Sequence, residues 1–517
     1  MNKRRWATGE SGAGATARPR RTQPLDRGFS LPASDHNPTI ILGVSVSVPH
    51  AARTAPPARE TAGRQTAGKT AALRVRVVAA ALITCMALGA CGSAAPERKA
   101  AGDATCRGKL SGTAYITVWF HASASVGGEW QTMVGQVADF NRSQRQVRVK
   151  LITLPEGDYS QEVASAAASG SLPDVLDFDG PNLYNYAWAG DLKPLDSCLT
   201  LGQRGDLLPS LRRQGMYEGR TWGVGTFDSG LGLYVRRSIL HKAGISIPTS
   251  PSQAWTAAQF TRILARLQAI GYRQPLDLQI NYSSKAPEWN TYGFAPAVWS
   301  AGGDLIDRNG YRRVYGFMNG GPAIGALGII QGWARSGFVN PDRNGMAFEQ
   351  GQTPISWVGH WLFDAYTKAF PGDVEIVPLP RFGSRDVTDM GSWQWGITAN
   401  ATNGDAAWRF ISFLLRPAQV VQMTHADGAV PGTYRAIQLS PRFAPGGPEH
   451  LYVEQLETGV AKPRPQTAAY PALTAAFAKA FQQIVVGLKP VKPTLDAAAR
   501  SVTADLIAHD YYANTGG

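Results

Sequence analysis

The sequence predicts an α/β fold divided into two lobes, and two observations lead to this prediction. At 517 residues the chain exceeds a single typical domain, so more than one hydrophobic core is expected. From about residue 113, short apolar runs alternate with stretches of helical periodicity, which is the pattern of an α/β protein. No internal repeat or long low-complexity stretch interrupts 113–510, so this whole region is expected to fold.

The first lobe is expected to begin with strand, helix, strand, helix, strand. The apolar runs at 114–120, 147–152 and 172–179 are the three predicted strands. Helical spacing at 134–140 and small residues at 161–169 predict the helices between them. Because strands joined by helical crossovers run in the same direction, this order predicts a parallel sheet.

The middle of the chain is predicted to be mostly helical. A helix opening at 254 has four apolar residues on one face: Phe260, Ile263, Leu264 and Leu267. Segments 323–337 and 406–415 show the same periodicity. These helices are expected to cover the sheets of the two lobes.

The net charge of the chain is concentrated at its beginning. The chain carries +13 in total, but residues 1–90 contain 13 basic and 4 acidic residues, which leaves +4 for 91–517. Such a mild charge is too weak for a phosphate-binding surface, so no nucleic-acid partner is expected. The pattern GxxxxGK[ST] occurs at 63–70, yet no predicted strand precedes it, so a nucleotide site is not expected.

A short apolar segment predicts export. Arg74 and Arg76 precede an apolar stretch of 12 residues at 77–88, which is shorter than the roughly 20 residues that span a bilayer. The segment ends in Leu88-Gly89-Ala90-Cys91, which resembles the bacterial lipobox; the resemblance implies cleavage before Cys91 and a lipid on its side chain. An ordinary signal peptide that ends near a cysteine is the alternative.

The remaining N-terminal segments are assigned around this signal. Residues 71–91 are the predicted lipoprotein signal peptide, and 92–112 form a predicted tether that is rich in small residues at its start. Residues 1–70 are expected to be disordered or to be an extension annotated in error, with the true start downstream of Met1. Of the four cysteines, Cys106 and Cys198 lie in the exported part, so they are candidates for a disulfide or, alternatively, two unpaired thiols.

No catalytic or metal-binding signature stands out in the sequence. HExxH, GxSxG and CxxC are absent and the eight histidines are scattered, so no catalytic residue, metal or cofactor is predicted. Asp177 and Asp179 lie two residues apart on a predicted strand, an arrangement that suits glycosidase chemistry. The favoured interpretation is that these acids end a parallel strand beside a ligand crevice.

Ten segments occur in an order that resembles the extracellular solute-binding proteins of carbohydrate-uptake ABC importers, the family of maltose-binding protein. The resemblance spans roughly 113–508, and Trp255 with Phe260 and Tyr470 also fit it. The segments are LPDV at 172–175, AWAGDLKPLD at 187–196, YEGRTWGVG at 217–225, LYVR at 233–236, KAGI at 242–245, WSAGGD at 299–304, FEQG at 348–351, GHW at 359–361, GSW at 391–393 and PRP at 463–465.

The resemblance implies a two-lobed periplasmic-binding-protein-like fold of type II, hinged, with a ligand cleft between the lobes. Lobe 1 is expected at 113–226 and 380–428, and lobe 2 at 229–378 and 430–510. The chain is expected to cross between them near 225–228, 378–380 and 429–431.

The resemblance and the positions of residues after strands also suggest a ligand site. A pyranose has apolar C–H faces and a rim of hydroxyls, which fit aromatic rings together with carboxylates and guanidinium groups. Trp188, Trp255, Trp333 and Trp408 lie in helical patterns and are expected to pack in the core, and packing is the alternative for every aromatic candidate. The candidate ligand-binding residues are Phe120, His121, Asp179, Tyr184, Asp228, Trp299, Trp361, Trp393, Trp395, Arg464 and Tyr470.

The expected function is that of a binding protein held on the extracellular face of the cell membrane by its lipid. It would capture a mono- or oligosaccharide, act as a monomer, and deliver the sugar to the permease subunits of an ABC transporter. Two alternatives remain open: an extracellular carbohydrate-active enzyme that uses Asp177 or Asp179, and a ligand-binding subunit of a membrane sensor.

Overall fold

The computed structural model describes residues 102–122, 127–280, 288–341 and 344–513. Gly92–Gly517 form one compact unit. The predictions for 1–70, for the GxxxxGK[ST] pattern, for the signal segment with Cys91 and for the tether up to residue 101 lie outside the described residues.

Lobe 1 is built on a four-stranded sheet that contains the three predicted strands. Its elements are β1 Ala114–Ala122, α1 Gly127–Ser143, β2 Val147–Pro155, α2 Glu156–Ser169, β3 Val175–Asp179 and β13 Trp393–Ile397. The strand order is β13-β3-β1-β2, with β1, β2 and β3 parallel and β13 antiparallel to β3. The carboxyl ends of β1 and β3 therefore lie at one edge of the sheet, close to the start of β13.

Shorter helices and strands and two C-terminal helices complete lobe 1. They are η1 Gly180–Asn182, α3 Leu183–Ala189, α4 Leu201–Asp206, α5 Pro209–Gln214, β4 Met216–Tyr217, β5 Arg220–Thr221, α11 Gly404–Leu414 and α12 Pro417–Asp427, while α13 Tyr434–Gln438 comes later in the chain. α11 packs on the β1–β13 face through Trp408, Phe410 and Phe413, all of them buried. Residues far apart in the sequence therefore complete the core of lobe 1.

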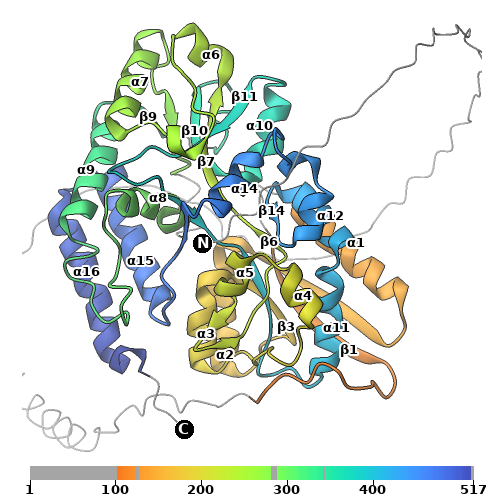
Figure 1. The fold of residues 1–517 in the computed structure, drawn as a ribbon. Helices are drawn as coiled ribbons and strands as arrows, with labels where there is room; N and C mark the ends of the chain where they lie inside the picture. The colour runs from red at the N-terminus through yellow and green to blue at the C-terminus, as the bar shows by residue number, and fades with distance from the viewer. Residues whose placement is uncertain (1–101, 123–126, 281–287, 342–343, 514–517) are drawn as a thin grey trace, which may run out of the picture. The chain divides into compact units, whose positions relative to one another are not determined.

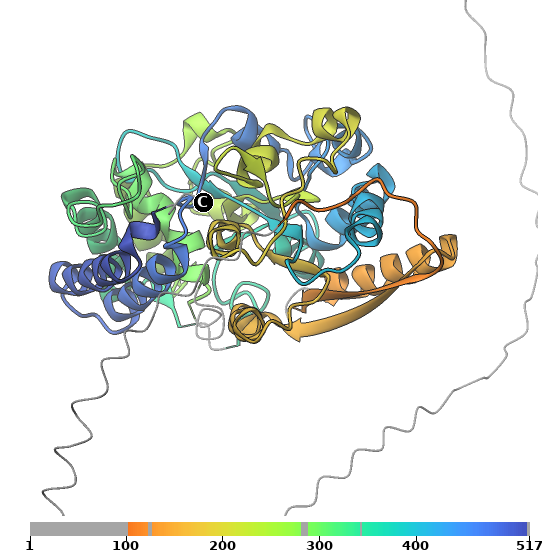
Figure 2. The ribbon, with the colours of Figure 1, turned by 90° about the horizontal axis from the view of Figure 1, so that it is seen from below.

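Lobe 2 has a five-stranded mixed sheet in the order β11-β7-β10-β8-β9. Its strands are β7 Leu231–Arg236, β8 Leu276–Asp277, β9 Val339–Asn340, β10 Ile355–Gly359 and β11 Val374–Val377. Its helices are α6 Arg237–Lys242, α7 Ala257–Ala269, α8 Glu288–Ser300, α9 Gly321–Arg335, η4 His360–Leu362, α10 Phe363–Ala369, α14 His450–Glu457, α15 Tyr470–Phe481 and α16 Val491–Ala508. Figures 1 and 2 show α15 and α16 beside each other, on the side of the molecule opposite to α1.

Helix α7 forms where the periodicity predicted it. All four of its predicted core residues are buried. Thr256 caps its start, because the Thr256 hydroxyl accepts a hydrogen bond from the Gln259 amide while the Gln259 side chain accepts one from the Thr256 amide. The predicted core tryptophans Trp255, Trp333 and Trp408 are also buried, whereas Trp188 is half-buried and lies against Tyr512.

The chain crosses between the lobes at three places, one of which differs from the prediction. Strand β6 Phe227–Asp228 pairs with β14 Val430–Pro431, so two crossings run side by side in the predicted positions. β12 Thr388–Met390 pairs with β15 Ala461–Pro463, and the third crossing follows it at Gly391 and Ser392.

The prediction of a crossing near 378–380, with lobe 1 resuming at 380, is therefore wrong by about ten residues. The physical reason is a pair of backbone hydrogen bonds at the start of α7: the Arg381 amide donates to the Trp255 carbonyl, and the Ala257 amide donates to the Arg381 carbonyl. Phe382 also packs against Trp333, so residues 381–390 stay with lobe 2.

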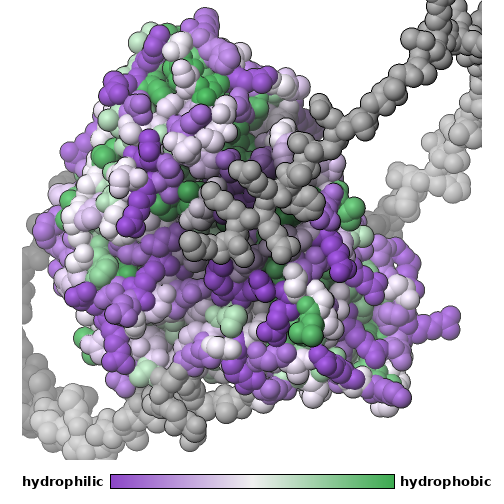
Figure 3. Space-filling view, in the orientation of Figure 1, coloured by the Kyte–Doolittle hydropathy of each residue, from purple (hydrophilic) through white to green (hydrophobic). Residues whose placement is uncertain are grey.

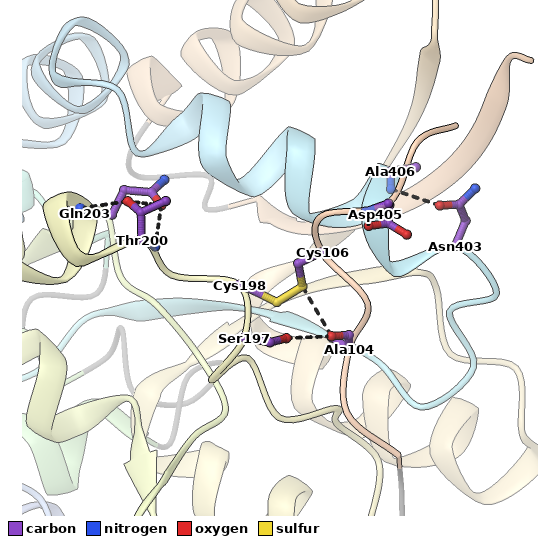
Figure 4. Close-up of a disulfide and its surroundings, with 10 residues drawn as sticks. Ala104, Cys106, Ser197, Cys198, Thr200, Gln203, Asn403, Asp405 and Ala406 are labelled. Carbon is purple, nitrogen blue, oxygen red and sulfur yellow. Dashed lines mark hydrogen bonds between the residues drawn. A yellow bond between two sulfur atoms is a disulfide. The ribbon is translucent and has the colours of Figure 1, made fainter. Parts of the chain in front are cut away.

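A disulfide fastens the segment that enters lobe 1. Cys106 is bonded to Cys198, with their Cα atoms 5.0 Å apart (Figure 4). Beside it the Ser197 hydroxyl donates to the Ala104 carbonyl, and the Ala104 amide donates to the Pro194 carbonyl. Residues 103–106 are thus held against the loop that follows α3, and of the two alternatives for these cysteines the structure contains the bonded one.

Candidate functional site

A cavity of about 340 Å³ lies between the two lobes. Lobe 1 contributes residues at the ends of β1, β3 and β13 and on α1, α2 and α12, while lobe 2 contributes residues on α8, η4 and α15. Phe227, Ser229, Gly391 and Ser392 line it from the crossings. The cavity therefore lies where ligands of open α/β sheets bind, beyond the carboxyl ends of parallel strands. Figure 3 shows a largely hydrophilic outer face with hydrophobic residues in small groups.

Aromatic rings line the cavity from both lobes. On lobe 2, the Trp361 ring lies 5.7 Å from the Trp289 ring and 6.2 Å from the Tyr292 ring, measured between centroids. On lobe 1, Trp393 stacks on His121 at 3.4 Å with an interplanar angle of 8°. Rings on opposite walls can contact two faces of one flat guest.

An arginine joins the two lobes at the cavity. Arg464, which follows β15, donates two hydrogen bonds to the Asp179 carboxylate at 2.9 and 3.0 Å and one to Glu288 at 2.7 Å. Tyr470 and Thr474 donate their hydroxyl hydrogens to Glu288 as well. Because Asp179 ends β3 and Glu288 begins α8, the guanidinium links lobe 1 to lobe 2. Burial raises the pKa of Glu288, and the charge of Arg464 opposes that rise.

His121 is held between two acids. Its Nδ1 lies 2.5 Å from Asp177 Oδ2, and its Nε2 lies 3.4 Å from Glu129 Oε1. Burial lowers the pKa of His121, but the charges of Glu129 and Asp177 outweigh it and hold that pKa well above the ordinary value. Burial raises the pKa of Asp177 to about 6, with His121 opposing the rise. We infer a positively charged His121 at neutral pH.

His360 and Asp427 meet across the crossing. The ring Nδ1 of His360 lies 2.8 Å from the backbone oxygen of Asp427, so that nitrogen carries the hydrogen. Burial lowers the pKa of His360 to about 4, so its ring is neutral at neutral pH. One carboxylate oxygen of Asp427 accepts from the Ala429 amide at 2.7 Å. The other has no hydrogen-bond partner among the residues that the structure describes.

Five of the eleven candidate residues line the cavity: His121, Asp179, Trp361, Trp393 and Arg464. Tyr470 does not line it but bonds to Glu288, which does.

The other five candidates serve packing or the crossings and do not line the cavity, so their predicted place in it is wrong. Phe120 and Trp395 stack on each other at 6.0 Å in the lobe 1 core, because Phe120 faces the side of the sheet opposite to His121. Tyr184 hydrogen-bonds to the Gln214 carbonyl and to Gln466, away from the cavity. Asp228 is fully buried at the crossing and accepts from the Ser229 amide.

Trp299 lies inside lobe 2 rather than in a loop. It belongs to the last turn of α8, where its ring nitrogen donates to Asp304 at 2.9 Å and its exposure is 1%. The start of the same helix carries Trp289 and Tyr292, which do line the cavity. Ten residues of helix, about 15 Å, separate Trp289 from Trp299.

The sequence reasoning missed several cavity residues. They are Glu129, Glu156, Glu288, Trp289, Tyr292, His360 and Asp427. A signal existed for one group, because Glu288 and Tyr292 lie four residues apart and Trp289 is next to Glu288, so all three lie near the same first turn of a helix. No comparable pattern marks Glu129 or Asp427.

Both acids that the enzyme alternative would use are held in ion pairs. Asp177 is 1% exposed and bonded to His121, while Asp179 is bonded to Arg464, so neither is placed as a proton donor above the cavity. Within the described residues, no cluster of three or more His, Cys, Asp or Glu side chains is arranged to hold a metal. In that same part of the chain, no helix is both long and apolar enough to cross a bilayer.

Several known proteins are similar to this chain in sequence. A putative binding protein of Brucella abortus is 20% identical over 287 residues, which are 52% of this chain and 65% of that protein. The chain thus spans slightly less than two thirds of that relative. An uncharacterized lipoprotein of Streptomyces antibioticus is 21% identical over 401 residues, 71% of this chain and 78% of that protein.

Solved structures share the fold. The GacH receptor of Streptomyces glaucescens, determined unliganded and with acarbose, matches with a TM-score of 0.65 and 21% identity, over 76% of this chain and 99% of that one. The cyclic α-maltosyl-1,6-maltose binding protein of Arthrobacter globiformis matches with a TM-score of 0.61 and 25% identity over the same shares. The predicted two-lobed α/β fold is confirmed. The family model of bacterial extracellular solute-binding proteins matches residues 135–445, more than half of the chain, and the protein belongs to that family.

Proposed function

We propose that this protein binds a carbohydrate between its two lobes on the outer side of the cell membrane and delivers it to an ABC-type importer. The observation that carries the proposal is the cavity between the lobes, with tryptophan rings on both of its walls and carboxylates between them. Its volume of about 340 Å³ suits a small ligand.

The lining chemistry fits a sugar better than an apolar guest. Trp361 and Trp393 come from opposite lobes and offer ring faces to the C–H faces of a pyranose. Asp179 and Glu288 accept hydrogen bonds, as a rim of hydroxyls requires. The name of the Arthrobacter globiformis protein says that it binds a maltose-type saccharide, and its fold is shared with this chain.

Delivery requires a protein that closes on its guest and reopens. The paired crossings at β6 and β14, with the third at Gly391, place three narrow connections between the lobes. A ligand that contacts both lobes binds the closed state better and shifts the equilibrium toward it. We place the protein at the membrane through a lipid on Cys91, as its lipobox-like sequence suggests, and as a monomer.

The test is calorimetric titration with a panel of mono-, di- and trisaccharides. Trp361→Ala removes a stacking face, so we expect it to weaken the binding of a sugar that the native protein binds by about tenfold or more, which is about 1.4 kcal/mol. Trp130→Ala is the matched control, because Trp130 is 41% exposed on α1 and does not line the cavity. Equal affinity of a folded Trp361→Ala variant, checked by circular dichroism, would remove Trp361 from the site.

A further inference from the structure

The charges that line the cavity do not balance. Its lining includes five carboxylates: Glu129, Glu156, Asp179, Glu288 and Asp427. The basic groups in the lining are Arg464, His121 and His360, and burial keeps His360 neutral at neutral pH. A neutral sugar supplies hydroxyls to such a wall but no charge to offset its acids.

Each positive group in the lining is already shared by two acids. Arg464 bonds to both Asp179 and Glu288. His121 lies between Asp177, which is behind the cavity wall, and Glu129. Neither cation is therefore left to neutralise a further carboxylate.

Glu156 and Asp427 are the two lining carboxylates outside both pairs, and of these Asp427 is the buried one. It is 3% exposed and lines the cavity, yet one of its oxygens has no hydrogen-bond partner within the described residues. The charged groups that act on it are Glu129, Glu449 and Arg442. Arg442 is engaged by Glu449 and Asp364, so it is not available as a dedicated partner.

A buried carboxylate without a partner is unfavourable, and a ligand group can relieve this. Burial first, and then the charge of Glu129, raise the pKa of Asp427 well above its ordinary value. This agrees with a site whose own residues supply no dedicated positive charge to Asp427.

Two aromatic rings lie near His360, which contacts Asp427. His360, whose ring donates to the Asp427 carbonyl, lies 5.2 Å from the Trp361 ring and 6.3 Å from the Phe227 ring. All of these residues line the cavity. Ring faces beside carboxylates are the chemistry that recognises an ammonium group.

We propose that the ligand is a cationic carbohydrate, and that its ammonium group binds against Asp427 and Glu129 while its sugar rings contact the tryptophans. This inference rests on the proposed function and narrows its ligand class. An uncharged hydroxyl at the same place would not stabilise the ionised forms of Asp427 and Glu129.

The experiment compares matched sugars by calorimetry at neutral pH. The panel contains glucosamine and its α- and β-linked di- and trisaccharides, the same compounds N-acetylated, the corresponding neutral glucose compounds, and choline and putrescine as cations without a sugar ring. We expect at least one amine to bind about tenfold or more tighter than both of its uncharged counterparts. In Asp427→Asn, which keeps the side-chain shape and the acceptor for Ala429, that preference should fall by about fivefold or more.

Two further variants complete the design. Glu129→Gln should reduce the preference in the same direction. Asp139→Asn removes an acid from a surface pair with Arg142 and should leave the preference unchanged. Thermal unfolding of each variant verifies that it is folded.

The outcomes separate this inference from the proposed function. If glucose compounds bind as tightly as the amines, or if folded Asp427→Asn keeps the full preference, the cationic ligand is wrong while carbohydrate binding stands. If choline or putrescine binds and no saccharide does, the carbohydrate function is wrong and the charge argument stands. If nothing in the panel binds, both are wrong.

Discussion

At neutral pH His121 is positively charged and His360 is neutral, because the groups beside the two rings differ. Both rings are buried, and burial alone lowers the pKa of an imidazole. His121 has Glu129 and Asp177 beside its nitrogens, and their charges more than reverse that effect. His360 faces the uncharged backbone oxygen of Asp427, so burial dominates.

Because the pKa of His360 is low in the folded protein, the free energy of unfolding decreases as the pH falls. The unfolded histidine has a pKa near 6.5, and the folded one about 4, so the unfolded chain binds more protons between these values. The contribution of neutral His360 to the free energy of unfolding is fully present above pH 6.5 and is lost as the pH falls through 4. It amounts to about 3 kcal/mol over this window.

His360→Asn tests this dependence, because asparagine can still donate to the Asp427 carbonyl. Between neutral pH and pH 4 we expect the unfolding free energy of the native protein to fall by about 3 kcal/mol more than that of the variant, measured by urea denaturation. His241→Asn, at an exposed histidine on α6, should follow the native protein. Parallel curves for native protein and His360→Asn would show that the buried ring does not resist protonation.

At the scale of elements, hydrophobic periodicity predicts the long helices and strands and fails on the short ones. The strands at 114–120 and 147–152 and the helix carrying Phe260 have enough residues for an alternating or helical pattern to emerge. The third crossing follows β12, which has three residues, too few for any period. This is why that crossing was misplaced.

The same limit explains which tryptophans could be assigned from sequence. Every residue of α8 after Glu288 is buried, so this helix has no polar face to orient it. Trp289 at one end lines the cavity and Trp299 at the other packs in the core, yet both look alike in sequence. Trp361 and Trp393 could be proposed because they lie in the segments GHW at 359–361 and GSW at 391–393, which carry the family resemblance.

The disulfide fastens the segment that leads into β1 to lobe 1. The bond joins residues 92 positions apart, so it restricts a large loop of the unfolded chain. Replacing Cys106 and Cys198 together by alanine should lower the unfolding free energy by about 2–5 kcal/mol in a denaturant titration.

Ligand affinity should stay the same in this double variant, because neither cysteine lines the cavity. The native protein treated with a reductant under unfolding conditions should reproduce the loss. An unchanged unfolding midpoint in both samples would mean that the bond contributes little.

For the whole molecule, one charged contact that joins the lobes across the cavity is the Arg464 pair. Arg464 is 4% exposed, with Asp179 on lobe 1 and Glu288 on lobe 2 as carboxylate partners. Removing one acid from a buried pair leaves a poorly compensated charge, which is strongly unfavourable. The molecule can relieve this by opening, because separated lobes let water reach the guanidinium.

Asp179→Asn should therefore open the ligand-free protein. Small-angle X-ray scattering should give a larger radius of gyration than for the native protein, and a bound ligand should reverse the change because it restores contacts to both lobes. Asp196→Asn is the matched control: Asp196 pairs with Arg220 in lobe 1, on the surface and away from the cavity. If Asp179→Asn scatters like Asp196→Asn and the native protein, the ion pair does not hold the lobes together, and the balance between open and closed states must be set at the crossings instead.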